Sequence, residues 1–152
     1  MDSRGRPNWP ARFPTRLIAS AAAAGELFVV EIGGAPVATL TLQWSDPRFW
    51  GNPTLGDEDD DAGYVHRLAV RRAHAGHGLG YRLLDWADGA VRATGRSRLR
   101  LDVVSDNERL RRYYEGAGFV HQRDVDGEFV LPGGTRRPWR TSLYERPGAG
   151  AR

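Results

Sequence analysis

The chain has 152 residues, of which 40% are hydrophobic and 27% are charged, and this suits one domain with one hydrophobic core. The absence of cysteine excludes disulfides, thiolate metal sites and a cysteine nucleophile. No apolar stretch approaches the roughly 18 residues of a transmembrane helix. The first residues lack the basic and apolar regions of a signal peptide. We therefore expect a cytoplasmic protein with no membrane partner.

The formal net charge is +3, and every basic residue is an arginine. Guanidinium groups suit phosphates, so the arginine content raises the alternative of polyanion binding. The charge is modest and the sequence has no long basic run. We therefore do not expect a nucleic-acid partner.

The N-terminal part of the sequence is expected to form an irregular segment, a helix and a β-hairpin. Residues 1–13 are rich in Pro, Arg and Asn and predict an irregular segment. Pro14–Ala24 is rich in alanine and starts with proline, which predicts a helix that ends at Gly25. Glu26–Ile32 and Val37–Trp44 predict two strands joined by a tight glycine turn.

The middle of the chain predicts a strand–helix–strand unit. Asp46–Ala62 contains turn-forming residues and a run of acids, and it predicts a solvated loop. Gly63–Val70 predicts a strand. Apolar residues then recur at helical spacing from Leu79 to about Thr94, and Arg98–Val104 alternates as the next strand.

The C-terminal part predicts one more helix and a hairpin. Ser105 and Glu108 have the spacing of a capping box, which predicts a helix that Gly118 closes. Residues 119–125 and 140–146 predict a final pair of strands, and residues 147–152 predict a frayed tail. This order of helices and strands predicts a mixed α/β layer fold over residues 14–146. It has one βαβ unit in the middle and antiparallel strands at both ends.

The glycine-rich turn after Val70 carries the clearest chemical signal. Gly76, Gly78 and Gly80 alternate where a strand meets a helix, and glycine allows a tight turn and a close approach of a ligand. The free N–H groups of the first helical turn form an anion site. Arg71, Arg72, His74 and His77 add nearby cationic or polar groups. The segment predicts a pyrophosphate cradle.

Two common nucleotide-binding motifs fit this segment poorly. A Walker P-loop requires GK[ST] after the glycines, whereas this chain has Gly80-Tyr81-Arg82. A dinucleotide fingerprint requires G-x-G-x-x-G, and its last position is Tyr81 or Leu83 here. Asp102 has the spacing of a ribose-binding acid, but Gly76 lies too far after the strand for that tight turn.

The segment resembles the GNAT (Gcn5-related N-acetyltransferase) family. In that family a strand of the form L-x-V leads to R/Q-x-x-G-x-G/A, and Leu68-Ala69-Val70 and Gly76–Gly80 are similar. An Asn and a Y-E-x-x-G-F helix end follow in the family, as Asn107 and Tyr114–Phe119 do here. A closing L-Y-E strand is present at Leu143–Glu145. The resemblance covers residues 27–146.

Two departures from the family pattern stand out. The Arg or Gln that opens the family's loop is Ala75 here, which removes one side-chain contact to a pyrophosphate. The family also places a strand and a helix before the segment that starts near Trp9. We therefore expect a sheet that lacks its first strand, with an exposed edge near Glu26–Ile32, and hence a homodimer or a longer natural parent.

The resemblance implies direct transfer of an acyl group from acetyl-CoA to an amine. It implies that Tyr114 protonates the leaving thiolate, that the backbone near Leu68 polarises the thioester carbonyl, and that Asn107 contacts CoA. The implied CoA-binding residues are Leu68, Ala69, Val70, Arg71, Arg72, Ala75, Gly76, His77, Gly78, Leu79, Gly80, Asn107 and Tyr114.

His66 is the candidate general base, since its ordinary pKa near 6.5 suits a base at neutral pH; the alternative is a structural histidine held by a carboxylate. Tyr64, His66, Leu68 and Val70 are expected to share one strand face. Asp102 on the neighbouring strand would orient His66 or bind a cationic substrate. The spacing of the four histidines matches no metal motif, so no metal is expected.

The segment after the first hairpin supplies candidate acceptor contacts. Trp44, Asp46 and Trp50 would line an aromatic pocket, with Asp46 and Asp102 attracting the amine. The predicted function is N-acetylation of a small-molecule primary amine. A non-catalytic CoA- or nucleotide-binding module is one alternative. An acyltransferase that acts on an RNA-linked or protein amine is another.

Overall fold

The computed structural model describes residues 15–51 and 61–148. The helices are α1 (Thr15–Ala23), α2 (Pro47–Trp50), the 3-10 turn η2 (Arg72–His74), α3 (Leu79–Ala93) and α4 (Glu108–Gly116). The strands are β1 (Leu27–Ile32), β2 (Ala35–Gln43), β3 (Ala62–Val70), β4 (Arg98–Val104), β5 (Val120–Val130) and β6 (Arg136–Arg146).

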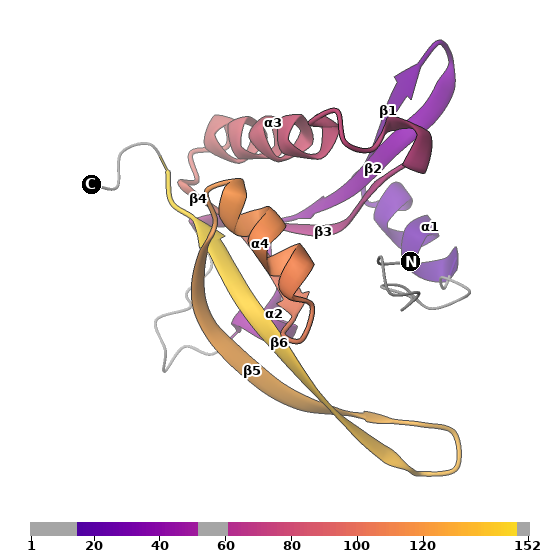
Figure 1. Cartoon of the computed structure of the whole chain (residues 1–152), viewed down its shortest axis with the longest axis vertical. Coiled ribbons are helices and arrows are strands. Elements are labelled where there is room, and N and C mark those ends of the chain that lie inside the picture. Colours follow the sequence, from indigo (N-terminus) through magenta and orange to yellow (C-terminus); the bar gives the residue numbers. More distant parts are fainter. Residues whose placement is uncertain (1–14, 52–60, 149–152) are drawn as a thin grey trace.

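Six strands form one mixed sheet in the order β1-β2-β3-β4-β6-β5. The pairs are antiparallel except β3 and β4, which run parallel on either side of the α3 crossover. The β5–β6 hairpin extends far beyond the body of the molecule (Figure 1). The predicted α/β class and the central βαβ unit are confirmed. β1 lies at one edge of the described sheet.

The larger hydrophobic core lies between the sheet and the helices α3 and α4. It joins Leu40 and Leu42 of β2 to Leu84 of α3, Leu101 of β4 and Tyr114 of α4. We call this side of the sheet the pocket face. The alternation of apolar residues along β4 and the helical spacing in α3 produce this arrangement.

A smaller core lies on the opposite side of the sheet, under the short helix α2. Its members are Trp50, Ala62, Tyr64 and Leu143. The buried Arg100 guanidinium lies 4.4 Å from the centroid of the Trp50 ring and donates through Nε to Glu145 at 2.8 Å. We call this side the histidine face.

Three details differ from the sequence-based expectation. The predicted loop 46–62 contains the helix α2, because Pro47 and the buried Trp50 stabilise a short turn; its residues 52–60 lie outside the described residues. The last two strands run further than 119–125 and 140–146, since their pairing continues to Val130 and Arg136.

The third difference concerns the start of α4. Asn107 is the N-cap, and its Oδ1 accepts a hydrogen bond from the Leu110 N–H at 3.1 Å. Ser105 instead contacts the Ser142 hydroxyl at 2.8 Å, so the predicted capping box at Ser105 is wrong. In the described residues, no helix is long and apolar enough to span a membrane.

Candidate acyl-CoA site

Strands β3 and β4 separate part of the way along their length. Their parallel pairing covers only Ala62–Tyr64 against Arg98–Arg100, although β3 continues to Val70 and β4 to Val104. The backbone groups of the later β3 residues that point toward β4 therefore have no partner in that ladder. We call this divergence of β3 and β4 beyond Tyr64 and Arg100 the strand opening.

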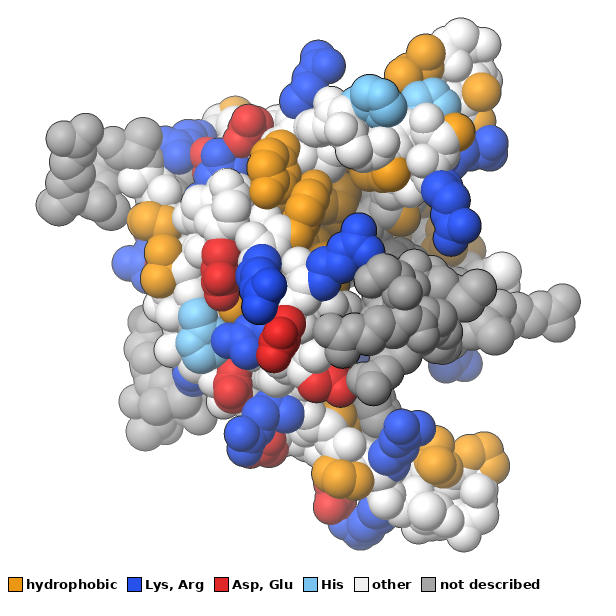
Figure 2. Space-filling model, viewed as in Figure 1, with side chains coloured by type: hydrophobic (Ala, Val, Ile, Leu, Met, Phe, Trp, Pro, Cys, Tyr) orange, Lys and Arg blue, Asp and Glu red, His pale blue; other side chains and the backbone are white. Residues whose placement is uncertain are grey.

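A pocket of about 560 Å³ lies between β3, the start of α3 and α4. In the space-filling view, hydrophobic side chains gather in the hollow beside α3 (Figure 2). The lining residues are Leu68, Val70, His74, Ala75, Gly76, Gly78, Leu79, Gly80, Tyr81, Asn107, Arg109, Leu110, Tyr113 and Tyr114.

The glycine loop forms one wall of this pocket. Gly76 and Gly78 have φ values of 79° and 75°, and a Cβ at either position would meet nothing within 4 Å. Glycine is therefore required by the left-handed backbone and not by crowding. Gly78 is the N-cap of α3, without a side-chain hydrogen bond, and the first turn contains no acidic residue. The N–H groups of this turn are suited to an anion.

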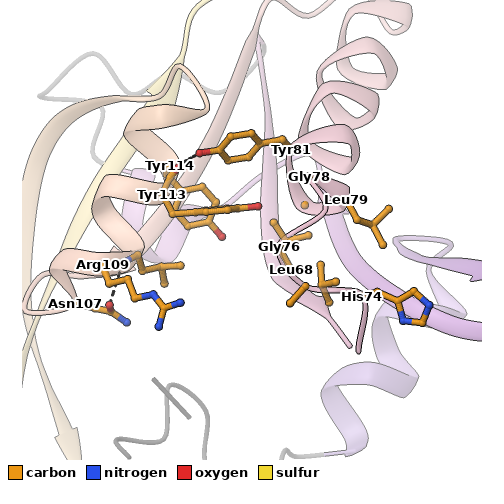
Figure 3. A pocket seen from close by; sticks show the side chains of 14 residues that line it. Leu68, His74, Gly76, Gly78, Leu79, Tyr81, Asn107, Arg109, Tyr113 and Tyr114 are labelled. Atoms are coloured by element: carbon orange, nitrogen blue, oxygen red, sulfur yellow. Dashed lines mark hydrogen bonds between the residues drawn. The ribbon is translucent and has the colours of Figure 1, made fainter. Parts of the chain in front are cut away.

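Helix α4 forms the opposite wall and presents two adjacent tyrosines. Figure 3 shows both phenols directed from α4 into the space beside the glycine loop. The Tyr113 hydroxyl lies against Gly80, where a Cβ would collide with it. The Tyr81 hydroxyl donates to the Tyr113 carbonyl at 3.1 Å, so Tyr81 ties α3 to α4.

Tyr114 is buried, with 8% of its surface exposed. Burial raises the pKa of its hydroxyl well above the usual range, and Tyr113 and the charge of Asp102 add to this effect. The phenol therefore stays protonated at neutral pH.

A β-bulge reverses the side-chain alternation of β3 just before the pocket. Thr41 pairs with His66 and Thr39 with Ala69, so β3 has one extra residue there. Arg67 lies within this bulge and has a φ of 54°, a left-handed conformation found in one type of bulge. As a result, Tyr64 belongs to the histidine-face core, whereas Leu68 and Val70 pack on the pocket face. Tyr64 and His66 share the histidine face as expected, whereas the expectation that Leu68 and Val70 share that face is wrong.

On the histidine face, His66 lies between two carboxylates. Its Nε2 is 3.4 Å from Asp46 Oδ2, and its Nδ1 is 3.5 Å from Asp102 Oδ1. Asp46 is 7% exposed, and its Oδ2 has no hydrogen-bond partner among the described residues. The three residues form a cluster of titratable groups beside the strand opening.

Burial controls the protonation of this cluster. It lowers the pKa of His66, and the charge of Asp46 opposes the shift. It raises the pKa of Asp46, against the opposing charge of His66. Burial and the charge of Asp46 together raise the pKa of Asp102 to about 7. A neutral imidazole beside Asp102, whose carboxyl titrates near neutrality, can accept a proton.

The same three side chains are the one group of described residues whose spacing could hold a metal ion, with ligand atoms within 4.8 Å of one another. The geometry favours a different role. Each imidazole nitrogen faces a different carboxylate, and only one nitrogen can bind a given ion. The carboxylates are therefore better placed to orient the ring than to share a metal with it.

The structure brings together most of the CoA-binding residues expected from the sequence. Those that line the pocket are Leu68, Val70, Ala75, Gly76, Gly78, Leu79, Gly80, Asn107 and Tyr114. Ala69, Arg71, Arg72 and His77 do not line it. The His77 ring instead contacts the Ala75 carbonyl at 2.9 Å.

The residues proposed to bind the acceptor are divided. Asp46 and Asp102 lie beside His66. Trp44 instead packs against the pocket-face core, with the Arg96 guanidinium 5.1 Å from its ring centroid. Trp50 is 1% exposed and belongs to the smaller core. Neither tryptophan is therefore placed to form an open acceptor pocket.

Sequence reasoning missed one charged lining residue, Arg109. It precedes Tyr113 by four residues, as Leu110 precedes Tyr114, so helical spacing puts all four along one side of α4. The sequence contains this signal: once Tyr114 is placed in the site, helical spacing also places Arg109 on the side of α4 that faces it.

Two curated proteins share part of the sequence. The uncharacterized N-acetyltransferase YesJ of Bacillus subtilis is 36% identical over 55% of this chain and 47% of its own length. N-alpha-acetyltransferase 40 of Saccharomyces cerevisiae is 46% identical over 45% of this chain and 32% of its own length. The chain thus spans less than half the length of either relative.

Solved structures share the fold. A GNAT-family acetyltransferase from Listeria monocytogenes superposes with a TM-score of 0.67, 23% identity, and coverage of 89% of this chain and 72% of its own. The protein yncA from Salmonella typhimurium, solved with its cofactor acetyl-CoA, gives a TM-score of 0.63, 20% identity, and coverage of 91% and 77%.

The family model for acetyltransferases of the GNAT type matches residues 2–119. This match includes the glycine loop, the strand opening and both tyrosines of α4. The chain belongs to the acetyltransferase (GNAT) family.

Proposed function

We propose that this protein transfers an acetyl group from acetyl-CoA to a primary amine. One observation carries the proposal. A buried phenol, Tyr114, and a histidine held between two carboxylates lie on opposite faces of the sheet, at the point where β3 and β4 separate. A candidate proton donor on one face and a candidate proton acceptor on the other support the proposal.

The pocket is chemically suited to acetyl-CoA. The N–H groups at the start of α3 suit its pyrophosphate, and the open space above Gly76 and Gly78 lets the phosphates approach the backbone. Leu68, Val70 and Leu110 offer apolar contacts to the pantetheine arm. When bound, acetyl-CoA supplies the activated acyl group as a thioester.

The surrounding groups account for the proton movements. The amine attacks the thioester carbonyl carbon, a C–N bond forms and the C–S bond breaks. His66 takes the amine proton, and the Tyr114 hydroxyl donates its proton to the departing sulfur. Backbone N–H groups of β3 beyond Tyr64, which have no partner on β4, are suited to stabilise negative charge on the carbonyl oxygen.

The raised pKa of Tyr114 has two consequences. It keeps the phenol in the protonated form that an acid needs, and it increases the cost of giving up the proton to a thiolate. Proton transfer is therefore expected to accompany C–S cleavage, when the sulfur gains negative charge. A negative charge on the nearby Asp102 would increase that cost. Proton transfer from Tyr114 should therefore be easiest when the Asp102 carboxyl is protonated.

The first candidate acceptor is a small primary amine. The side chains of His66 and Asp46 are only 19% and 8% exposed, which favours a compact group at the cluster, and the two carboxylates favour a cationic one. A protein α-amine is the second candidate. It is favoured by the similarity to N-alpha-acetyltransferase 40.

A screen for thiol release tests the proposal. The protein and acetyl-CoA are incubated with polyamines, amino acids and aminoglycosides, and with a short peptide in free and N-acetylated forms. We expect amine-dependent release of CoA and a product heavier by one acetyl group. Acetyl-CoA binding without thiol release for any amine would instead support the non-catalytic binding module.

A further inference from the structure

The glycine loop lacks the permanent cation that a phosphate-binding site favours. The position that opens the loop is Ala75, and the neighbouring Arg71 and Arg72 do not line the pocket. Backbone N–H groups supply only partial charges, whereas a CoA molecule carries several negative charges on its phosphates. A cation from elsewhere in the chain would complement them.

Arg109 is the one described residue with a permanent charge that lines the pocket. Figure 3 shows its side chain extending from α4 into the space opposite the glycine loop. It makes no ion pair or hydrogen bond with the described residues. Its neighbour Glu108 faces Arg112 instead, at 3.5 Å from that guanidinium, and no carboxylate among the described residues lines the pocket.

The position of Arg109 is unfavourable for the isolated protein. It lies in the first turn of α4, where the helix dipole disfavours a cation. An unpaired guanidinium at this end of a helix therefore gains nothing from local structure. An anionic ligand between the two helices would offset the cost.

We propose that Arg109 binds a phosphate group of CoA and so replaces the cation missing at Ala75. This inference rests on the proposed function, because it places CoA in the pocket. Arg109 is a specificity residue: it distinguishes CoA from carriers that present the same pantetheine arm without that phosphate. The guanidinium donates to phosphate oxygens from the α4 wall of the pocket, and the backbone N–H groups of the glycine loop donate from the opposite wall.

The test is a calorimetric titration with three ligands. Acetyl-CoA, 3′-dephospho-acetyl-CoA and S-acetylpantetheine are each titrated into the unaltered protein, Arg109→Gln and Arg112→Gln. The control residue Arg112 lies on the same helix and is 78% exposed. A charged hydrogen bond of about 1.5–3 kcal/mol predicts that Arg109→Gln weakens acetyl-CoA binding by roughly 10–150-fold, and that Arg112→Gln has less than a threefold effect.

The ligand series identifies the phosphate. If the loss in Arg109→Gln disappears with the 3′-dephospho ligand, Arg109 contacts the 3′-phosphate; if it persists there and disappears with S-acetylpantetheine, Arg109 contacts the pyrophosphate. An equal loss for all three ligands, no loss for acetyl-CoA, or an equal loss in Arg112→Gln would overturn the inference. No acetyl-CoA binding by the unaltered protein would overturn the proposed function itself.

Discussion

The two faces of the sheet at the β3–β4 opening have opposite chemical character. The pocket face is formed by glycine backbone, apolar side chains and two phenols, with Arg109 as its permanent charge. The histidine face concentrates three titratable groups, Asp46, His66 and Asp102, within a few ångströms. The first face is suited to hold a large anion, and the second to receive an amine and move its proton.

This comparison shows how one strand can serve both faces. Without the bulge at Arg67, His66 and Leu68 would point the same way, because side chains two apart on a strand share a face. The extra residue sends His66 to the histidine face and Leu68 to the pocket face. Both lie close to the opening, so a base and a thioester could meet across the strand.

The largest effect is expected for the acid on the pocket face. Tyr114→Phe keeps the packing against Phe119, whose ring centroid lies 5.8 Å away, and removes only the hydroxyl. General acid catalysis contributes typically 10²–10⁴-fold, so kcat should fall within about that range while acetyl-CoA affinity stays nearly constant. Steady-state kinetics and calorimetry measure the two quantities. Tyr113→Phe is the matched control.

Kinetics with both tyrosine variants also test whether Tyr114 is the general acid. A loss below about threefold in Tyr114→Phe would exclude it as the acid, and a large loss in Tyr113→Phe would transfer the role to that residue. Loss of folding is measured separately by circular dichroism.

A smaller but clear effect is expected for the base on the histidine face. His66→Gln should lower kcat by roughly 10²-fold, because the carboxylates that remain can accept the amine proton in part. His121→Gln is the control, since His121 is exposed and pairs with Asp124 at 2.8 Å. The pH dependence of kcat/KM measured for both variants should change only for His66→Gln. An identical profile for the two would contradict the assignment.

The smallest effect is expected on stability, through Asp102. Its folded pKa of about 7 lies above the ordinary value of 3.8. The folded state therefore binds more protons than the unfolded state between these values, and the free energy of unfolding falls as the pH rises through that window. Asp102→Asn removes the titrating group. The variant should gain stability relative to the unaltered protein between pH 5 and pH 8, by at most about 2.7 kcal/mol, because the folded carboxyl keeps a proton that the unfolded chain has lost over roughly two pH units of that window, at about 1.36 kcal/mol each.

Urea unfolding at the two pH values measures this gain. Asp126→Asn serves as the control, because Asp126 is exposed and paired with Arg140. A constant difference between Asp102→Asn and the unaltered protein at both pH values would mean that Asp102 titrates in the ordinary range. The histidine face would then not be the desolvated cluster described here.

Much of this fold could be predicted from local pattern. The glycines at 76, 78 and 80, the helical spacing after Leu79 and the alternation of β4 are short-range signals, and the structure has these elements within a residue or two of the expected bounds. The glycine loop and Tyr114 were assigned to one site by a family resemblance. The pocket lining agrees with that grouping.

The unpredicted features depend on contacts distant in sequence. The bulge at Arg67 exists only in the register between β2 and β3, and no local rule marks an arginine for a left-handed conformation. The sequence pattern predicts the cap at Ser105, but Ser105 bonds to the distant Ser142 and Asn107 caps α4 instead. Trp44 likewise packs against the pocket-face core and the distant Arg96, which its position in the sequence does not indicate.

The central claim is that acetyl-CoA is held at the glycine loop on the pocket face. Gly78→Val and Gly95→Val form a matched pair: both glycines have left-handed φ values, 75° and 85°, and neither has a neighbour within 4 Å of a Cβ. Only Gly78 lines the pocket. In calorimetric titration with acetyl-CoA, Gly78→Val should lose at least about tenfold in affinity, the equivalent of one charged hydrogen bond. Gly95→Val should keep the affinity of the unaltered protein. Equal affinity in the two variants would contradict the claim.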